Sequence, residues 1–324
     1  DQAIAAFKKS ITLNPNCADV YIDMGNVLKS QGKIEEAINA FKKAIELKPD
    51  HVDAYSKIAN AFQYQGNMND AIIAYKKSIE LKPDNPYLHK NLSFALLNIG
   101  NVREGLDEYE WRWKVPNLLK KRYFLQPMWD GKKSLDGKSI LIWSEQGIGD
   151  TLNWSSYINF VSSKVDNCIL ECQNKLVPLL QRSFPDIDVR PENSNFDLVR
   201  NDFDFHLPMG SIYKYFFEEI SESHKPKKIL NPDPERIKFW KNRLYSLGTG
   251  PYIGISWKSS NMSNNRLQNY SKISDWSAIF KISGITLINL QYKDFEDDLI
   301  KIYDQFGVKV HNFNDLDQFN ISTM

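Results

Sequence analysis

The segment from Trp143 to Thr151, Trp-Ser-Glu-Gln-Gly-Ile-Gly-Asp-Thr, has the residue types of a ligand-binding turn between a strand and a helix. Gly147 and Gly149 permit a tight turn, and a helix that begins there presents unpaired backbone N–H groups to an anion or another polar ligand. Asp150 falls in the first turn of this helix, where a carboxylate is a good cap. We therefore expect a bound polar ligand beside Gly147 and Gly149.

A dinucleotide site is an alternative interpretation of the same segment. The Rossmann fingerprint needs a third glycine, and Leu152 stands at that position. Glu171 ends the next predicted strand, which is the place of the acidic residue that binds a ribose. An enzyme that uses a nicotinamide or flavin cofactor is therefore possible but is not the favoured interpretation.

His206 and two cysteines are further residues that could do chemistry. His206 ends a predicted strand, where it faces a substrate or is an ordinary half-buried histidine. Cys168 and Cys172 are four apart in a predicted strand, which separates them by about 13 Å. This distance is too long for a disulfide or a shared metal ion. We expect no metal site and interpret both cysteines as buried apolar residues.

A repeat of 34 residues occupies the first third of the chain. The residues that recur at this step include Gly32, Gly66 and Gly100, and Pro15, Pro49 and Pro83. Large and small residues alternate at helical spacing within each unit, and small residues let two antiparallel helices approach closely. The pattern resembles the tetratricopeptide repeat (TPR) and predicts an α-helical solenoid over residues 1–116.

Such arrays bind extended peptides on the face formed by the first helix of each repeat. The residues predicted on this face are Asp19, Ile22, Asn26 and Lys29, and one repeat later Asp53, Ser56, Asn60 and Gln63. Asn26 and Asn60 lie in register, so their amides could hold a peptide backbone. Phe94 breaks this series in the next repeat, and solvated polar groups are the alternative interpretation of both asparagines.

Strands and helices alternate after the repeats. The predicted strands are residues 139–144, 167–172, 187–189, 203–207, 252–257, 286–291 and 308–313. This alternation predicts α/β domains, each with a parallel sheet and crossover helices. The expected parts are the repeats (1–116), an aromatic and basic linker (117–137), a first Rossmann-like domain (138–231), a connecting helix (232–248) and the start of a second Rossmann-like domain (249–324).

The charge of the chain is balanced. Lys and Arg number 41 and Asp and Glu 40, so the net charge is +1. Nucleic acids and anionic membranes are bound through a basic excess, and the balance argues against both as partners. The sequence contains no run of 18 apolar residues and no signal sequence, so we expect no membrane span and a cytoplasmic location.

Five motifs in order carry a more specific resemblance. They are Glu-Tyr-Glu-Trp-Arg-Trp (108–113), Trp-Asp-Gly (129–131), Ser-Glu-Gln-Gly-Ile-Gly-Asp (144–150), Gly-Ile-Ser-Trp-Lys-Ser (254–259) and Asn-Leu-Gln-Tyr (289–292). With these motifs the chain resembles the bacterial TPR proteins fused to a glycosyltransferase domain of the heptosyltransferase group (glycosyltransferase family 9). More distantly, the architecture is similar to protein O-linked N-acetylglucosamine transferase.

The resemblance implies a GT-B fold, in which an acceptor domain and a nucleotide-sugar domain face each other across a cleft. It implies an inverting, metal-independent transfer without a cofactor, in which Asp150 is the general base. Lys258, Ser260 and Arg266 are then the groups that neutralise the leaving diphosphate. His206 would line the acceptor side and is the second candidate base.

The two ends of the sequence depart from the family pattern. Residues 1–13 match only the second helix of a repeat, and the segment that grips the nucleotide in the family is missing after Asn320. We therefore expect a fragment of a longer glycosyltransferase whose repeats recruit a protein or glycan acceptor. The alternative is a non-catalytic interaction scaffold with an inactive α/β domain.

Overall fold

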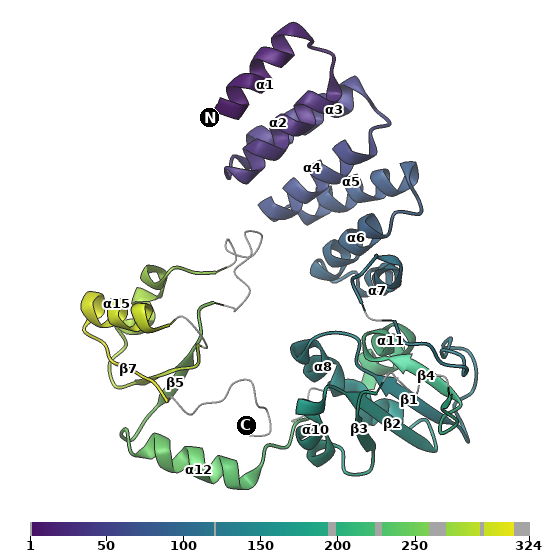
Figure 1. The fold of residues 1–324 in the computed structure, drawn as a ribbon, viewed down its shortest axis with the longest axis vertical. Coiled ribbons are helices and arrows are strands. Elements are labelled where there is room, and N and C mark those ends of the chain that lie inside the picture. Colours follow the sequence, from purple (N-terminus) through teal and green to yellow (C-terminus); the bar gives the residue numbers. More distant parts are fainter. Residues whose placement is uncertain are drawn as a thin grey trace. The chain divides into compact units, whose positions relative to one another are not determined.

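A computed structural model describes residues 2–119, 121–193, 199–223, 229–258, 270–291 and 295–313 (Figure 1). The chain divides into two compact units. One consists of residues 1–171 with 192–226, and the other of residues 172–191 with 227–324. The first unit contains the repeats and most of the first sheet, and the second contains the second sheet.

The repeats form an α-helical solenoid, as predicted. Their helices in the described part of the chain are α1 (Gln2–Leu13), α2 (Ala18–Ser30), α3 (Ile34–Leu47), α4 (Val52–Gln65), α5 (Met68–Leu81), α6 (Pro86–Asn98) and α7 (Val102–Tyr109). Each helix packs against the next one along the chain, so that α2, α4 and α6 are the first helices of the repeats and α3, α5 and α7 the second. A short 3-10 helix, η1 (Glu110–Lys114), follows α7 directly.

Backbone conformation explains the recurring glycine. Gly32, Gly66 and Gly100 have φ angles of +77°, +84° and +80°, a left-handed conformation that side chains disfavour. Each lies in the turn after the first helix of a repeat, and Gly66 is the C-terminal cap of α4. A glycine is therefore needed at the same point of every repeat.

Small residues bring paired helices together in the core of the repeats. Phe41 of α3 and Tyr75 of α5 occupy equivalent positions, and both are fully buried. A Cβ atom on Gly25 would lie only 2.5 Å from the ring of Phe41, so α2 and α3 need a glycine for their close approach. Ala59 takes the equivalent position beneath Tyr75 and is also fully buried.

The first sheet follows a linker and has the strand order β3-β2-β1-β4. Its strands are β1 (Ser139–Trp143), β2 (Asn167–Cys172), β3 (Asp188–Pro191) and β4 (Phe205–Pro208). β1 pairs in parallel with both β2 and β4. The chain moves outward from β1 to β3 and then returns to the other side of β1, so the strand order reverses between β1 and β4. In parallel sheets ligands bind at the carboxyl ends of strands at such a switch point.

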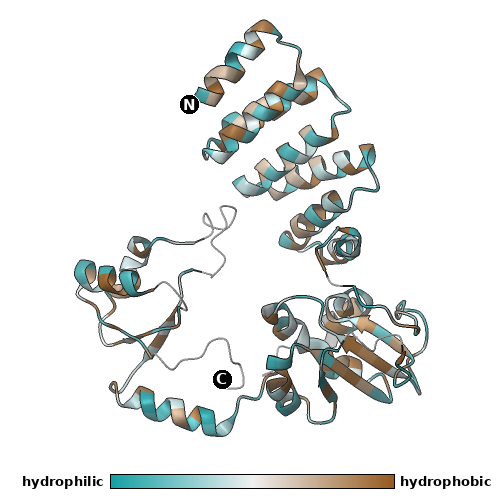
Figure 2. Cartoon of the chain, in the orientation of Figure 1, coloured by the Kyte–Doolittle hydropathy of each residue, from teal (hydrophilic) through white to brown (hydrophobic). Residues whose placement is uncertain are grey.

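Short helices connect these strands. They are α8 (Ile148–Trp154), α9 (Ile158–Ser162) and α10 (Val177–Ser183), and α11 (Ile212–Ser223) follows the last strand, β4. β1 and β2 are mainly hydrophobic (Figure 2), and Ile140, Leu141 and Ile142 are fully buried. Continuous apolar strands of this kind are typical of a parallel sheet that is covered on both faces.

The second sheet has three parallel strands in the order β5-β6-β7. Its elements are α12 (Pro234–Tyr245), β5 (Tyr252–Ile255), α14 (Ser277–Phe280), β6 (Thr286–Asn289), α15 (Glu296–Phe306) and β7 (Val310–His311). The strands are shorter than the predicted ones. After the ends of β5 and β6, Gln291 Oε1 accepts hydrogen bonds from the Ser256 hydroxyl and the Trp257 N–H, and Asn289 Oδ1 accepts one from the Gln291 N–H. The prediction of a helical solenoid followed by parallel sheets is confirmed.

Candidate functional site

The two asparagines predicted to bind a peptide differ in their surroundings. Asn60 Oδ1 accepts a hydrogen bond from the Tyr75 hydroxyl at 2.9 Å, and Asn60 Nδ2 donates to the Ser56 carbonyl at 2.8 Å. Asn26 lies at the equivalent position of the preceding repeat, where Phe41 replaces Tyr75 and offers no hydroxyl. The half-buried Asn26 side chain makes no hydrogen bond to any described residue. Asn26 is therefore available to a ligand, whereas Asn60 is partly committed to its own repeat.

Ile22 was wrongly predicted to face the same ligand. It is only 7% exposed and belongs to the apolar cluster that contains Ile4 and Ala18. Its hydrophobic side chain is removed from water here, while the equivalent residues Ser56 and Lys90 remain half-buried. We use the term first-helix face for the remaining exposed or half-buried positions of α2, α4 and α6, which are Asp19, Asn26, Lys29, Asp53, Ser56, Asn60, Gln63, Tyr87, Lys90 and Phe94.

Lys29 lies on the first-helix face one turn after Asn26, and the charge of Lys57 on α4 acts on it. Burial lowers the pKa of Lys29, and the positive charge of Lys57 lowers it further. Two lysines in mutual repulsion favour a ligand that supplies a negative charge. Asp19, on the same face, is less available to a ligand. Its carboxylate already accepts a hydrogen bond from His51 Nε2 at 2.9 Å, which lowers the pKa of Asp19.

The first-helix face becomes aromatic in the third repeat. Tyr87 is 52% exposed and Phe94 is 45% exposed, which is unusual for such large apolar rings. The Lys90 ammonium lies 5.7 Å from the centre of the Phe94 ring. The face thus combines a polar, positively charged part with an aromatic part, and this suits a peptide that carries an acidic and an apolar residue.

Asp150 caps α8 and faces solvent. Its Oδ2 accepts a hydrogen bond from the Gly147 N–H at 3.2 Å, and the Thr151 hydroxyl donates to the Gly147 carbonyl at 3.1 Å. Neither Gly147 nor Gly149 has a positive φ angle, so the turn does not itself require glycine. A Cβ atom on Gly149 would meet nothing within 4 Å. The loop therefore leaves open space beside an exposed carboxylate.

A buried ionic cluster at the switch point was not predicted from the sequence. Arg112 Nη2 lies 3.1 Å from Glu145 Oε1 and donates to Ser211 Oγ at 2.8 Å. Arg112 Nη1 pairs with Glu110, and Ser211 Oγ donates to the same carboxylate at 2.9 Å. The side chains of Arg112 and Glu145 are 2% and 1% exposed. We call these four residues the Arg112 cluster.

The Arg112 cluster joins the end of the repeats to the first sheet. Glu145 follows β1, Ser211 follows β4, and Arg112 comes from η1. Burial raises the pKa of Glu145, and the charge and hydrogen bonds of Arg112 offset this only in part. The carboxylates of Glu110 and Glu145 share the single positive charge of Arg112, so the negative charge of one carboxylate is not fully neutralised. The signal in the sequence was Arg112 itself, which stands where the earlier repeats have Ala44 and Ser78.

His206 lies in the middle of β4, among aromatic rings. The centre of its imidazole is 4.5 Å from that of Phe124, and its Nδ1 accepts a hydrogen bond from Trp143 Nε1 at 3.3 Å. A neutral histidine that accepts at Nδ1 carries its proton on Nε2. Neither nitrogen is then ready to take a proton from a substrate, so this arrangement favours Asp150 over His206 as a base.

Glu171 is enclosed by two arginines and is not placed to bind a ribose. Its side chain is 3% exposed, Oε2 lies 2.7 Å from Arg122 Nη2, and Oε1 accepts from Arg200 Nη1. Arg200 also holds Asp202 through two nitrogens. The carboxylate that a dinucleotide site would need is therefore used inside the first unit, which speaks against the nicotinamide or flavin interpretation.

Lys258 is held at the end of β5 by the second unit. Its Nζ lies 2.8 Å from Asp298 Oδ2, which also accepts from Trp257 Nε1 at 2.9 Å. Burial acts to raise the pKa of Asp298, but the hydrogen bonds from Lys258 and Trp257 outweigh it and the pKa is lowered. Ser260 and Arg266 lie outside the described residues.

The described part of the chain contains neither a candidate metal site nor a candidate membrane span. No group of three or more His, Cys, Asp or Glu side chains there is arranged to hold a metal ion. No helix described by the structure has the length and apolar character needed to cross a membrane. Cys17, Cys168 and Cys172 form no disulfide bond, and burial raises the pKa of the Cys168 thiol to about 12.

Comparison with known families decides the nature of the helical region. Residues 25–66 match the TPR repeat family, and residues 52–85 match the tetratricopeptide repeat family. The chain contains tetratricopeptide repeats. The crystal structure of MamA is similar to it with 26% identity and a TM-score of 0.33, over 34% of this chain and 65% of MamA. The first TPR of Spaghetti (RPAP3), solved with an HSP90 peptide, has 22% identity and a TM-score of 0.30 over 31% of this chain and 80% of its own.

A relative among curated proteins extends beyond the TPR repeats. Protein FlbA of Caulobacter vibrioides (strain ATCC 19089 / CIP 103742 / CB 15) is 28% identical over 227 residues. The match covers 64% of this chain and 37% of FlbA, so this chain spans little more than a third of the relative's length. Because the TPR repeats end near residue 116, a match of this length continues into the α/β region.

Proposed function

We propose that the TPR repeats bind a segment of another protein on the first-helix face, and that the α/β region transfers a sugar to this protein from a nucleotide-sugar. The observation that carries the first half is the free amide of Asn26 beside Lys29 on a confirmed TPR array. An extended peptide can bond to this amide while an acidic side chain meets Lys29 and an apolar one meets Phe94. Recruitment of a protein acceptor follows from this arrangement.

The proposal of sugar transfer is supported by the motif resemblance and by the type of fold. The strand order β3-β2-β1-β4 is that of a Rossmann-like half, and the loop after β1 lies at the end of the sheet where ligands bind. In the proposed step an acceptor hydroxyl oxygen bonds to the anomeric carbon, and the bond from that carbon to the diphosphate oxygen breaks. The hydroxyl proton passes to Asp150, and the nucleoside diphosphate leaves with inversion at the carbon.

Donor binding is assigned to the second unit in this proposal. Lys258 would exchange part of its contact with Asp298 for the diphosphate, and Ser260 and Arg266 would add a hydroxyl and a second cation. A GT-B arrangement is part of the same proposal. No metal or separate cofactor is invoked, because the lysine and arginine supply the positive charge that the leaving group needs.

A non-catalytic scaffold is the second candidate, and the Arg112 cluster favours it. The cluster occupies the switch point between β1 and β4 with the chain's own side chains, where a ligand of a parallel sheet would otherwise lie. In that case the repeats still bind a partner, while the first sheet serves only to hold the end of the array. Binding of a nucleotide-sugar distinguishes the two candidates.

The test measures the activity of the Asp150→Asn and Asp130→Asn variants relative to that of the wild-type protein. Asp130 is a matched control, because it is also exposed and its Oδ1 accepts backbone N–H groups, at 3.0 and 3.2 Å from Lys132 and Lys133. Asparagine keeps the capping oxygen in both variants but cannot take a proton. Release of nucleoside diphosphate from UDP-, GDP- or ADP-sugars should fall by roughly 10²- to 10⁴-fold for Asp150→Asn only.

Donor binding is measured separately by thermal shift. Lys258→Ala should abolish the stabilisation by the nucleotide-sugar. Lys301→Ala serves as the control, since Lys301 also lies near Asp298, at 3.7 Å, but is 60% exposed. If the turnover of Asp150→Asn is within threefold of that of wild type, Asp150 is not the general base. If none of the three nucleotide-sugars stabilises the protein, the α/β region is a non-catalytic scaffold.

A further inference from the structure

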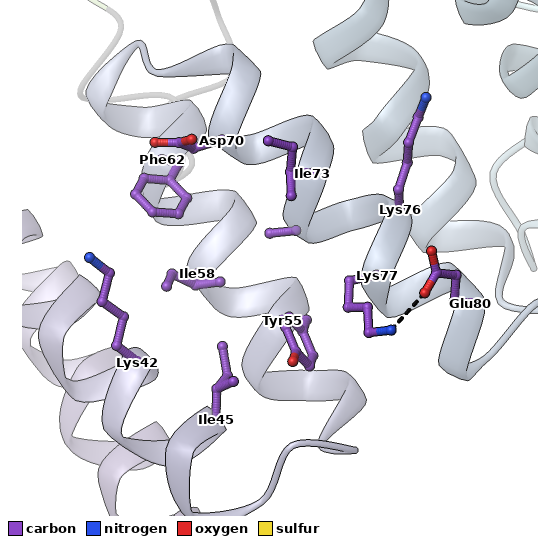
Figure 3. Close-up of a pocket in the computed structure, with 11 residues that line it drawn as sticks. Lys42, Ile45, Tyr55, Ile58, Phe62, Asp70, Ile73, Lys76, Lys77 and Glu80 are labelled. Carbon is purple, nitrogen blue, oxygen red and sulfur yellow. Dashed lines mark hydrogen bonds and ion pairs between the residues drawn. The ribbon is translucent and has the colours of Figure 1, made fainter.

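The TPR repeats carry a second open surface, on the other side of α4 from the first-helix face. A pocket of about 620 Å³ lies between α3 and α5, with α4 as its floor (Figure 3). We call it the α3–α5 pocket. Its lining residues are Lys42, Ile45, Tyr55, Ile58, Phe62, Asp70, Ile73, Ala74, Lys76, Lys77 and Glu80.

The floor of the α3–α5 pocket is apolar, and the mostly charged α5 wall adds the apolar side chains of Ile73 and Ala74. Asn60 is two residues from both Ile58 and Phe62, and at 3.6 residues per turn it therefore points to the opposite side of α4. Ile73 on the α5 wall is 67% exposed, although isoleucine is among the residues most often buried. The pocket thus exposes an apolar surface on the side of α4 that faces away from Asn60, separate from the first-helix face.

The equivalent place one repeat later is filled by the chain itself. His89 takes the place of Tyr55 there, and Trp111 takes the place of Lys77. The Trp111 indole stacks on the His89 imidazole with ring centres 3.7 Å apart and planes 1° from parallel. Of the floor residues there, Leu92 is buried like its equivalent Ile58, at 2% and 4% exposure, whereas Leu96 is 1% exposed and its equivalent Phe62 is half-buried. A planar aromatic side chain is therefore the group that this repeat geometry accommodates.

Charges around the α3–α5 pocket leave one lysine without a carboxylate. In the filled site, Lys76 pairs with Glu104 at 2.6 Å. The equivalent pair would be Lys42 with Asp70, but the Asp70 side chain is one carbon shorter than that of Glu104. Both carboxylates accept a hydrogen bond from the asparagine three residues before them, Asp70 from Asn67 at 2.6 Å and Glu104 from Asn101 at 2.8 Å. Lys77 pairs with Glu80 at 2.7 Å. Among the described residues, Lys42 is the lining lysine that has no acidic partner.

We propose that the α3–α5 pocket binds a segment of a partner protein that inserts an aromatic side chain over Tyr55 and Ile58 and places a carboxylate against Lys42. The aromatic ring takes the place that Trp111 fills one repeat later, and the carboxylate takes the place of Glu104. This surface is separate from the first-helix face, so the inference does not rest on the proposed peptide or sugar chemistry.

The experiment selects binders to the intact chain from a phage library of random 12-residue peptides. The enriched peptides should carry Trp, Tyr or Phe next to Asp or Glu. The Ile73→Glu substitution lies at an exposed position and leaves the fold intact, but it places a negative charge on the pocket wall. It should weaken the best peptide by at least tenfold, and Lys77→Trp should do the same by filling the pocket from within.

Matched variants separate the two faces. Lys42→Glu should weaken the peptide by roughly tenfold, whereas Lys43→Glu on the neighbouring residue, which does not line the pocket, should change its affinity less than twofold. Asn26→Ala should have no effect. Failure to enrich such peptides overturns the proposal, as does selection of peptides that depend on Asn26 and tolerate Ile73→Glu. The latter result would leave the proposed function of the first-helix face intact.

Discussion

A single hydroxyl group separates the roles of Asn26 and Asn60. Tyr75 donates to Asn60 Oδ1 and Gln63 Oε1, both at 2.9 Å, whereas Phe41 leaves Asn26 without this partner. Burial also raises the pKa of Tyr75, which keeps the phenol protonated as a donor. Two residues that are identical in the repeat pattern therefore differ in their surroundings: Asn60 is hydrogen-bonded within its own repeat, and Asn26 lacks the hydroxyl partner.

This difference predicts opposite results for two alanine substitutions. Asn60→Ala should lower the free energy of unfolding by about 0.5–1.5 kcal/mol, because the Tyr75 hydroxyl and Ser56 carbonyl each lose a partner. Asn26→Ala should change it by less than about 0.5 kcal/mol, as for an ordinary surface substitution. Urea denaturation followed by circular dichroism measures both. Equal destabilisation by the two variants would show that Asn26 is also a structural residue.

At the scale of elements, the last repeat differs from the others because it packs against the first sheet through the Arg112 cluster. The last repeat replaces a small residue with Arg112, and Gly105 allows Leu97 to pack where a Cβ atom would lie 2.8 Å from the Leu97 Cγ. Ion pairs between α7 and α11 add to the contact, with Lys214 Nζ 3.1 Å from Asp107 Oδ1 and Arg103 paired with Glu218. Because those pairs are partly or largely exposed, the buried Arg112 cluster dominates the joint.

The raised pKa of Glu145 predicts a pH dependence. A carboxyl group with a raised pKa in the folded state stabilises the fold below the ordinary pKa of glutamate, and this contribution is lost as the pH rises through the raised value. The stability of wild type should therefore fall as the pH rises above the ordinary pKa of glutamate. Glu145→Gln cannot ionise and should show a smaller fall.

The control for this measurement is Glu46→Gln, an exposed position whose side chain pairs only with Lys43 at the helix surface, at 2.8 Å. Its pH dependence should follow that of wild type. Urea unfolding across the same pH range compares the three proteins. If the free energy of unfolding of Glu145→Gln falls with pH as steeply as that of wild type, ionisation of Glu145 is not the cause of the pH dependence.

At the scale of the whole molecule, the repeats should fold without the α/β region. Each TPR repeat contacts only its neighbours, so residues 1–116 alone should be helical and unfold cooperatively. Removal of the first sheet takes Glu145 and Ser211 away from Arg112, and α7 should therefore become the least protected helix. Circular dichroism tests the first expectation.

Hydrogen exchange tests the second expectation. Amides of α7 should exchange faster in the fragment than in the whole chain, while those of α4, in the centre of the array, should keep their protection. A disordered spectrum for the fragment would contradict independent folding. Unchanged protection of α7 would show that the Arg112 cluster does not stabilise the end of the array.

The sequence by itself determined the repeats and the parallel α/β character of this protein. Glycine at a step of 34 and alternating large and small residues are local signals, and helices and strands form largely from such local periodicity. The predicted strand at 167–172 matches β2 residue for residue.

Only the tertiary structure decided which side chains meet. Arg112 and Ser211 are 99 positions apart in the sequence, and Glu171 and Arg200 are 29 positions apart. No local sequence pattern predicts either contact. The burial of Ile22 and the bond between Tyr75 and Asn60 likewise depend on how neighbouring helices pack. Hydrogen bonds and ion pairs are short-ranged, and their partners are chosen by the distances that the completed fold creates.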